Sequence, residues 1–375
     1  MTVTVYLDHA ATTPLRAEVL DAMMPFFTTD FGNPSGSHAV SRAARKAVDE
    51  SRDVVAECLG CQPGEVIFTG TGTEADNLAV TGSVARRPGR ALCSAIEHHA
   101  VLHTVQALRG SVVRVHSTGL VDLDALTAAL SPEVSVMSVM LANNEIGVVQ
   151  PLDQVVAMVR EHAPGAVVHT DAVQAFPWLD VAVLAAGTDL IAVSAHKFGG
   201  PKGVGALVAR AGARLAPILH GGGQERDRRS GTHNVAGIVG MAAAMRLTVA
   251  ERDATVARVG GLRDRLADTL QASVPGTAET GDRRHKVAGS CHVRFPGIES
   301  EALLVLLDDA GVCASAGSAC ASGAMEPSHV LAAIGMDRDE ARSAVRFSLG
   351  STTTSDDVDL AVKAVTGAVP YLREA

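Results

Sequence analysis

The chain has 375 residues, of which 47% are hydrophobic and 19% are charged, enough for a large core and for two domains or one large one. The net charge of −9 argues against a nucleic-acid scaffold, because phosphate binding needs clustered Lys and Arg. No apolar run reaches the roughly 20 residues that a membrane helix needs, and the N-terminus lacks a signal-peptide pattern. We therefore expect a cytoplasmic protein that does not contact a membrane.

Short apolar runs alternate with helical patterns through the first two thirds of the chain. A helix expected at 15–27 leads into a loop rich in Gly, Pro and Ser, and the strands predicted after it are 65–69, 90–94, 112–116, 134–141, 166–170 and 189–194. The helices predicted between them are 73–84, 100–108, 122–129 and 151–162. This alternation predicts a mostly parallel sheet that is covered by helices on both faces. Ligands of such sheets gather at the carboxyl ends of the strands.

A long helical pattern follows at 235–273, and after it a smaller α+β unit has strands near 290–295 and 345–348. We place the change of domain near 255–262, where Gly260 and Gly261 weaken the helical pattern. The prediction is a large α/β domain over 15–258 and a small α+β domain made of 1–14 and 259–375.

The six cysteines of the chain do not indicate a disulfide framework, because the cytosol would reduce one. Cys58 and Cys61 form a C-x-x-C pair, but no second pair or His pair completes a zinc set, so we expect no metal site. Cys93 lies in an apolar run and is expected in the core, and Cys313 at the end of another is expected to pack inward.

A glycine turn joins the first predicted strand to its helix, with the sequence Thr69-Gly-Thr-Gly-Thr-Glu-Ala75. Backbone N–H groups at a helix N-terminus bind phosphate, so we predict a phosphate site beside Gly72 and Thr73. The same residues fit a dinucleotide fingerprint loosely, but the match is weak.

Polar residues follow the last two predicted strands of the sheet. Asp171 ends one strand, with Gln174 three residues later, where a helix cap is an equally good interpretation. The other strand runs into Ser194, His196 and Lys197. Lysine is rarely buried unpaired, and burial lowers the pKa of a lysine and prepares its amine for Schiff-base chemistry.

A loop of small residues at 314–324 contains one cysteine, Cys320. By itself this pattern is typical of a flexible linker more often than of a loop that carries a nucleophile, and both interpretations stay open.

Spaced motifs between Tyr6 and Gly350 together resemble the NifS/IscS-type cysteine desulfurases. These are class V aminotransferase-like enzymes of fold type I that use pyridoxal 5'-phosphate. The motifs that carry the resemblance are Asp8-His-Ala-Ala-Thr-Thr-Pro14, Gly32-Asn-Pro-Ser35, Gly72-Thr-Glu-Ala-Asp-Asn77, Glu97-His98, Asn143-Asn-Glu-Ile-Gly147, Asp171-Ala-Val-Gln174, Ser194-Ala-His-Lys197, His220-Gly-Gly-Gly-Gln-Glu225, Arg229-Ser-Gly-Thr232, Gly317-Ser-Ala-Cys320 and Arg346-Phe-Ser-Leu-Gly350.

The resemblance implies a role for each residue of a cofactor site. Lys197 would bind pyridoxal phosphate covalently, Asp171 would pair with its ring nitrogen, and His98 would stack on the ring and transfer protons. Hydrogen bonds to the phenolic oxygen and contacts with the phosphate would come from the remaining cofactor-binding residues. These are Gly72, Thr73, Asn144, Gln174, Ser194, His196 and, from the partner subunit of a homodimer, Thr232.

The resemblance also implies the substrate and the product. Arg346, aided by Asn33, would bind the carboxylate of L-cysteine, and Cys320 would take its sulfur as a persulfide while L-alanine is released. The sulfur would pass to an acceptor protein for iron–sulfur cluster assembly or thiolation. The longer C-terminal tail with which IscS proteins contact their scaffold is not found after Tyr371, so docking of that scaffold stays open.

Three other functions compete with this one. A selenocysteine lyase would use the same residues, whereas another class V aminotransferase would have no use for Cys320. A sulfur-carrier or assembly subunit without activity is disfavoured by intact Lys197, Asp171 and Cys320. A hydrolase is rejected, since His220-Gly-Gly-Gly223 resembles an oxyanion-hole motif but no G-x-S-x-G motif accompanies it.

Overall fold

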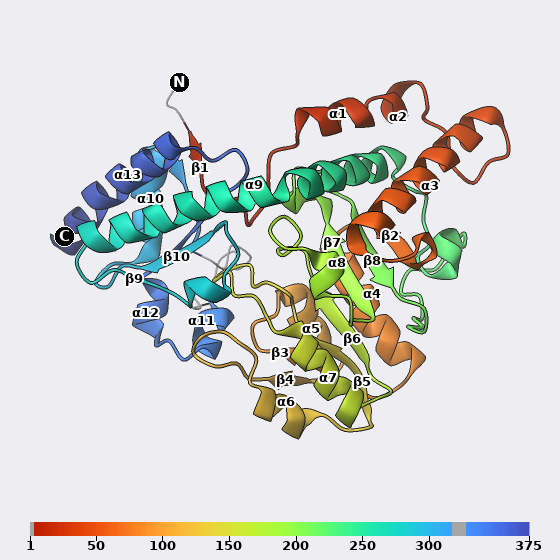
Figure 1. Ribbon diagram of the computed structural model, residues 1–375, viewed down its shortest axis with the longest axis horizontal. Helices are drawn as coiled ribbons and strands as arrows, with labels where there is room; N and C mark the ends of the chain where they lie inside the picture. The colour runs from red at the N-terminus through yellow and green to blue at the C-terminus, as the bar shows by residue number, and fades with distance from the viewer. Residues whose placement is uncertain (1–3, 317–327, 375) are drawn as a thin grey trace.

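The computed structural model describes residues 4–316 and 328–374, and its largest element is a seven-stranded sheet (Figure 1). From edge to edge the strands are β2 (Val66–Thr69), β8 (Gly205–Ala209), β7 (Leu190–Ser194), β6 (Val167–Asp171), β5 (Val134–Ser138), β3 (Arg90–Ser94) and β4 (Ser111–Val113). Neighbouring strands are parallel except where β8 pairs with β2 and β7. The expected α/β fold with a mostly parallel sheet is confirmed. Strand β8 was not expected, because its apolar run follows a glycine-rich turn and pairs back on β7.

The sheet is buried on both faces, which explains why its strands are apolar throughout. Ile67 packs with residues of helix α4 on one face, while its neighbours Val66 and Phe68 join the larger core on the other. That larger core also contains Val55 of helix α3, Val155 of α7 and further residues of α9. The helices around the sheet are α3 (Ala39–Leu59), α4 (Gly72–Arg86), α5 (His99–Ala107), α6 (Leu123–Ala129), α7 (Leu152–His162) and α8 (Val181–Leu184).

Helix α9 (Val235–Ser273) is the longest of the described elements, with 39 residues, and it runs along much of the molecule in Figure 1. It contacts α3 and α1 (Ala17–Met23) as well as the C-terminal helix α13 (Ser355–Glu374). The predicted change of domain at 255–262 therefore falls inside a continuous helix, and the boundary stays a prediction. Gly240 does not break this helix. A side chain there would meet Met23 of α1 at 2.6 Å, so glycine allows the two helices to approach closely.

A second, antiparallel sheet lies beside the C-terminal helices, with strand order β12-β10-β9. The N-terminal strand β1 pairs with β11, which places the start of the chain beside this unit. The bounds of these elements are β1 (Val5–Tyr6), β9 (Ala278–Glu279), β10 (Ser290–Arg294), α10 (Ser300–Asp309), β11 (Val312–Cys313), α11 (His329–Ala333), α12 (Arg338–Arg342) and β12 (Ala344–Ser348).

Two expectations need correction, and a third holds. The helix expected at 15–27 is two helices, α1 and α2 (Pro25–Thr28), because Pro25 has no N–H to continue the first. Cys313 is half-exposed on its short strand rather than packed inward, while Cys93 is buried as expected. None of the helices in the described ranges is long and apolar enough to span a membrane.

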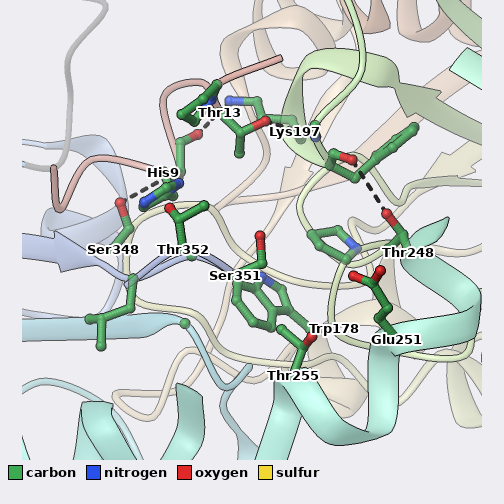
Figure 2. A pocket seen from close by; sticks show the side chains of 18 of the residues that line it. His9, Thr13, Trp178, Lys197, Thr248, Glu251, Thr255, Ser348, Ser351 and Thr352 are labelled. Carbon is green, nitrogen blue, oxygen red and sulfur yellow. Dashed lines mark hydrogen bonds between the residues drawn. The ribbon is translucent and has the colours of Figure 1, made fainter. Parts of the chain in front are cut away.

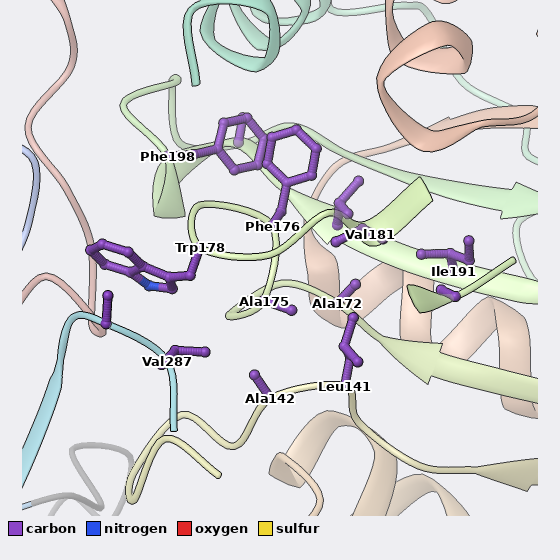
Figure 3. Close-up of a cluster of buried hydrophobic side chains, with 14 of the residues drawn as sticks. Leu141, Ala142, Ala172, Ala175, Phe176, Trp178, Val181, Ile191, Phe198 and Val287 are labelled. Atoms are coloured by element: carbon purple, nitrogen blue, oxygen red, sulfur yellow. The ribbon is translucent and has the colours of Figure 1, made fainter. Parts of the chain in front are cut away.

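An apolar cluster includes side chains from the segments that follow β5, β6 and β7 (Figure 3). Phe176 follows Asp171 in the chain and Phe198 follows Lys197, and their ring centroids are 4.7 Å apart. Trp178 and Val181 belong to the same core. Close packing of these rings keeps the turns after β6 and β7 in fixed positions.

Candidate active site

A cavity of about 340 Å³ lies where the parallel strands end, as expected for a sheet of this kind. The turns after β2, β3, β5, β6 and β7 each contribute to its lining, and β12 of the second sheet contributes Arg346. Ten of the residues predicted from the sequence line this cavity: Gly72, Thr73, His98, Asn144, Asp171, Gln174, Ser194, His196, Lys197 and Arg346.

Lys197 lies in a single 3₁₀ turn, Ala195–Lys197, directly after β7. Its Nζ donates hydrogen bonds to the carbonyl oxygens of Ala10 and Ala11, the latter at 2.9 Å. On its other side Lys197 lines a smaller cavity of about 80 Å³ that reaches Thr248 and Glu251 of α9 (Figure 2). The amine is therefore held by backbone carbonyls at the boundary of two cavities.

Asp171 ends strand β6, next to β7 in the sheet, and is almost fully buried. Its Oδ1 accepts a hydrogen bond from the backbone N–H of Val173 at 2.8 Å. Burial raises the pKa of this carboxyl to about 6, although the Val173 N–H and the charge of Lys197 oppose the shift. A carboxylate in such a place is stabilised by a cationic partner inside the cavity.

The N-terminus of α4 also lines this cavity, beside the turns after β6 and β7. Thr71 caps this helix by accepting a hydrogen bond from the N–H of Glu74, at 3.0 Å. A Cβ at Gly72 would meet Val173 at 3.0 Å and Ser194 at 3.2 Å, so the lack of a side chain helps the helix end to pack this closely. The first turn of α4 and Ser194 both line the cavity here, where the phosphate was predicted to bind, and that role stays a prediction.

Two histidines in the cavity are held in the neutral form. Burial, followed by the charge of Lys197, lowers the pKa of His98 to about 4 and that of His196 to about 4. His98 caps α5, and its Nδ1 accepts a hydrogen bond from the N–H of Ala100 at 3.1 Å. The proton of its neutral ring is therefore on Nε2. A neutral, flat ring with one N–H suits stacking on an aromatic ligand.

Arg346 of β12 is buried at the edge of the cavity, where a substrate carboxylate was expected to bind. Its guanidinium donates to the carbonyl oxygen of Asn144 at 2.9 Å and to Oδ1 of Asp8 at 2.7 Å. No local pattern in the sequence pairs Asp8 with Arg346, since the two residues are 338 positions apart. A bound carboxylate would share this guanidinium with Asp8 or displace it.

Three predicted site residues do not line this cavity in the described chain. Asn33 and Thr232 are exposed on segments outside it, and Oδ1 of Asn33 accepts a hydrogen bond from the N–H of Ser35. Cys320 lies outside the described residues. Their roles stay predictions.

Several lining residues were not singled out as site residues. Asp76 is a buried acid one turn into α4, and Glu145, His99 and His329 also face the cavity. Asp76 and Glu145 lie inside motifs that carried the resemblance, so their charge in an otherwise buried stretch was a usable signal. His329 follows the small-residue loop, and no local pattern marked it.

Comparison with known proteins agrees with this geometry. The family model of class-V aminotransferases matches residues 5–361. An IscS-like cysteine desulfurase of Mycobacterium tuberculosis is 43% identical over 99% of this chain and 97% of its own length. A solved NifS-like protein superposes with a TM-score of 0.92 at 34% identity, covering 99% of this chain and 100% of its own.

A further solved structure, described as SspA in complex with cysteine, superposes with a TM-score of 0.81 at 30% identity. It covers 94% of this chain and 100% of its own. Sequence and structure comparisons thus agree over almost the whole chain. The chain belongs to the class-V aminotransferase family, among the cysteine desulfurases of the NifS/IscS type.

Proposed function

We propose that this chain is a pyridoxal-phosphate enzyme that removes the sulfur of L-cysteine and releases L-alanine. The observation that carries the proposal is the placement of Lys197 and Asp171. They lie at the ends of adjacent strands, β7 and β6, and face one cavity that the N-terminus of α4 also lines. An amine, an acid and an anion site are thereby brought around one space.

The residues present fit pyridoxal phosphate. The amine of Lys197 would bind its aldehyde carbon, Asp171 would pair with its ring nitrogen, and the first turn of α4 would hold its phosphate. The amide oxygen of Gln174 is buried without a hydrogen-bond partner among the described residues, so this side chain is available to a ligand. When bound, the cofactor supplies an electron sink for the carbon next to the substrate's amino group.

The protein's own groups then bind the substrate and move its protons. Arg346 would hold the carboxylate of L-cysteine, exchanging part of its contact with Asp8. The Lys197 Nζ would take the proton from the α-carbon, because the carbonyls of Ala10 and Ala11 hold this amine at the cavity wall. The neutral ring of His98 would cover the reacting atoms and exclude water.

Sulfur transfer completes the proposed reaction. The thiolate of Cys320 forms a bond to the substrate sulfur, the substrate's carbon–sulfur bond breaks, and its electron pair takes up a proton on carbon. The balance is L-cysteine plus the Cys320 thiol giving L-alanine plus a persulfide on Cys320. The related SspA structure with bound cysteine supports the choice of substrate.

The partners follow from the same proposal. We infer a homodimer in which Thr232 reaches the partner's site, and a separate protein that accepts the sulfur for iron–sulfur assembly or thiolation. The proposed chemistry needs a free thiol at Cys320, which a reducing compartment such as the cytoplasm maintains.

Replacement of one thiol tests the function. Cys320→Ser should bind cofactor and substrate with the parent's absorbance changes, yet release neither sulfide nor alanine catalytically. Cys313→Ser is the matched control, since Cys313 lies on β11 outside the cavity, and it should keep its turnover. If Cys320→Ser turns over L-cysteine at the parent's rate without added thiol, an aminotransferase replaces the desulfurase as the better function.

A further inference from the structure

A row of buried polar groups lies beneath the cavity and has no part in the reaction proposed above. Ser138 of β5 and His169 of β6 are register partners in the sheet, and their Oγ and Nδ1 atoms are 2.9 Å apart. On one side, Oγ of Ser138 is 3.5 Å from Oε2 of Glu97. On the other, Nε2 of His169 is 3.5 Å from Oδ1 of Asp76, which lines the cavity.

Burial disfavours the ionised forms of the two carboxyl groups in this row, Glu97 and Asp76. Glu97 and His169 have no exposed surface, and Asp76 is 2% exposed. Burial, with the nearby charges of Asp171 and Glu97, raises the pKa of Asp76 well above its ordinary value, and burial raises the pKa of Glu97 to about 8. Two ionised carboxyls here would repel each other and Asp171, whose charge is partly offset by Lys197.

With one proton more than its fully ionised form holds, the row can place a hydrogen in each of its three contacts. Nε2 of His169 and Oδ1 of Asp76 face each other, and neither has a hydrogen-bond partner in the described parts of the chain. If Ser138 donates to Glu97, Nδ1 of His169 must donate to Ser138, and Nε2 is then an acceptor that needs a protonated Asp76. If Glu97 carries the proton, every donor reverses and Nε2–H points at an ionised Asp76.

These two arrangements differ only in which end holds the proton. Transfer moves a proton from Glu97 to Oγ of Ser138, the hydroxyl proton to Nδ1 of His169, and the Nε2 proton to Asp76. Burial lowers the pKa of His169 to about 3, so its ring stays neutral and relays the proton without keeping it. No group changes its net charge except the two carboxyls.

We propose a buried proton wire that shares one proton between two carboxyl groups and so sets the charge beside Asp171. Its members, in order, are Glu97, Ser138, His169 and Asp76. His169 lies two residues before Asp171 on β6, and Asp171 is close enough to Asp76 for its charge to raise the pKa of Asp76. Any influence of this proton on the pairing of Asp171 with the cofactor's ring nitrogen rests on the proposed function, whereas the wire itself does not.

Isosteric amides at the two ends test whether one proton is shared. Infrared difference spectra of the full-length protein without cofactor, at neutral pH, report the protonated carboxyl groups. Glu97→Gln replaces the protonated acid with an amide that donates to Ser138, so Asp76 should be ionised. Asp76→Asn should likewise leave Glu97 ionised. Each variant should lose one protonated carboxyl, and the double variant should lose no more.

Two independent protons would make the losses additive, and that result would overturn the wire. A proton that stays on one residue would persist in one of the single variants, and that result would also overturn the wire. The relay is tested with Ser138→Ala, which removes the link through the hydroxyl. In the Ser138→Ala background the protonation of Glu97 should no longer depend on that of Asp76. If the amide variants still lose one protonated carboxyl between them, the two carboxyls are coupled through space instead.

The ring of His169 gives a second measurement if one variant does not fold. In Glu97→Gln the ¹⁵N spectrum should show the hydrogen on Nε2, assigned by its loss in His169→Gln. A hydrogen on Nδ1 contradicts the wire. These measurements need no bound cofactor, so failure of the proposed function would leave them interpretable, and failure of the wire would leave the desulfurase proposal intact.

Discussion

Two regions of the molecule position their residues in different ways. One is the buried floor of the cavity, formed by the strand ends that carry Asp171 and Lys197, and the other is the pair of exposed segments that carry Asn33 and Thr232. Asp171 and Lys197 follow buried strands, and packing under their turns holds both in one chain. Asn33 and Thr232 are exposed and contribute nothing to the cavity of the described chain. Residues of the first kind can act within one subunit, whereas we propose that Thr232 acts only where two subunits meet.

Exposure does not make the segment before Thr232 loose. Glu225 is buried and accepts hydrogen bonds from Arg52, from His233 and from the N–H of Phe68. Glu225, Arg226 and Asp227 all have left-handed φ angles, between 49° and 63°, which non-glycine residues rarely adopt. The contacts of Glu225 therefore hold a strained turn in place, as a residue presented to another subunit requires.

Lys197→Ala should abolish both covalent attachment of the cofactor and turnover, because Lys197 is the amine that follows a buried strand at the cavity. Lys202→Ala is the matched control, since Lys202 is exposed and lies outside the cavity, and it should behave as the parent. Borohydride reduction followed by peptide mapping should find the pyridoxyl group on Lys197. A label on Lys202 would place the chemistry outside the buried floor.

Asp171→Ala should weaken cofactor binding at least about 100-fold. Removing one partner of a buried ion pair costs about 3 kcal/mol or more. Equilibrium titration with pyridoxal phosphate, followed by absorbance, measures the change. Asp171→Asn keeps the hydrogen bond from Val173 and should be intermediate. Equal affinity in parent and alanine variant would show that the ring nitrogen pairs elsewhere.

Glu225→Gln should lower the unfolding free energy by about 3 kcal/mol at neutral pH and flatten its dependence on acid. Burial alone would raise the pKa of Glu225, but hydrogen bonds from Arg52 and His233 lower it to about 2. A depressed folded pKa stabilises the protein above the unfolded value of roughly 4.3, and this contribution is lost as the pH falls to about 2.

Denaturant unfolding of both proteins between neutral pH and acid measures this difference. Arg226→Ala is the control, because Arg226 is exposed and its guanidinium donates to the carbonyl oxygen of Gly64 at 2.8 Å. If the parent and Glu225→Gln lose stability with equal slope in acid, the turn is not held by this carboxylate.

Thr232→Ala should weaken cofactor binding by about tenfold, the loss of one hydrogen bond to a charged group. Mixed dimers sharpen the test. A subunit with Thr232→Ala paired with a Lys197→Ala subunit should contain one unimpaired lysine site, because the intact Thr232 of the Lys197→Ala subunit reaches across to it; if Thr232 served its own subunit, that lysine site would be impaired. Full activity from an isolated monomer would contradict the proposal that Thr232 acts in the site of the partner subunit.

Local pattern predicted most of the sheet and the floor of the cavity. Buried strands read as continuous apolar runs, and the residues directly after them must lie at one edge of a parallel sheet. That rule places Asp171, Ser194 and Lys197 together from the sequence alone. The resemblance added the residues on other segments, of which His98, Asn144 and Arg346 reach the same cavity.

Pairings across the chain were decided by tertiary structure alone. The pairing of β8 with β2, the contact of Asp8 with Arg346 and the row from Glu97 to Asp76 each join segments that are distant in sequence. Periodicity reports which face of an element is buried, but it does not report what that face meets. A buried polar group obtains its partner only after the elements pack, and the charge that it then carries depends on that partner.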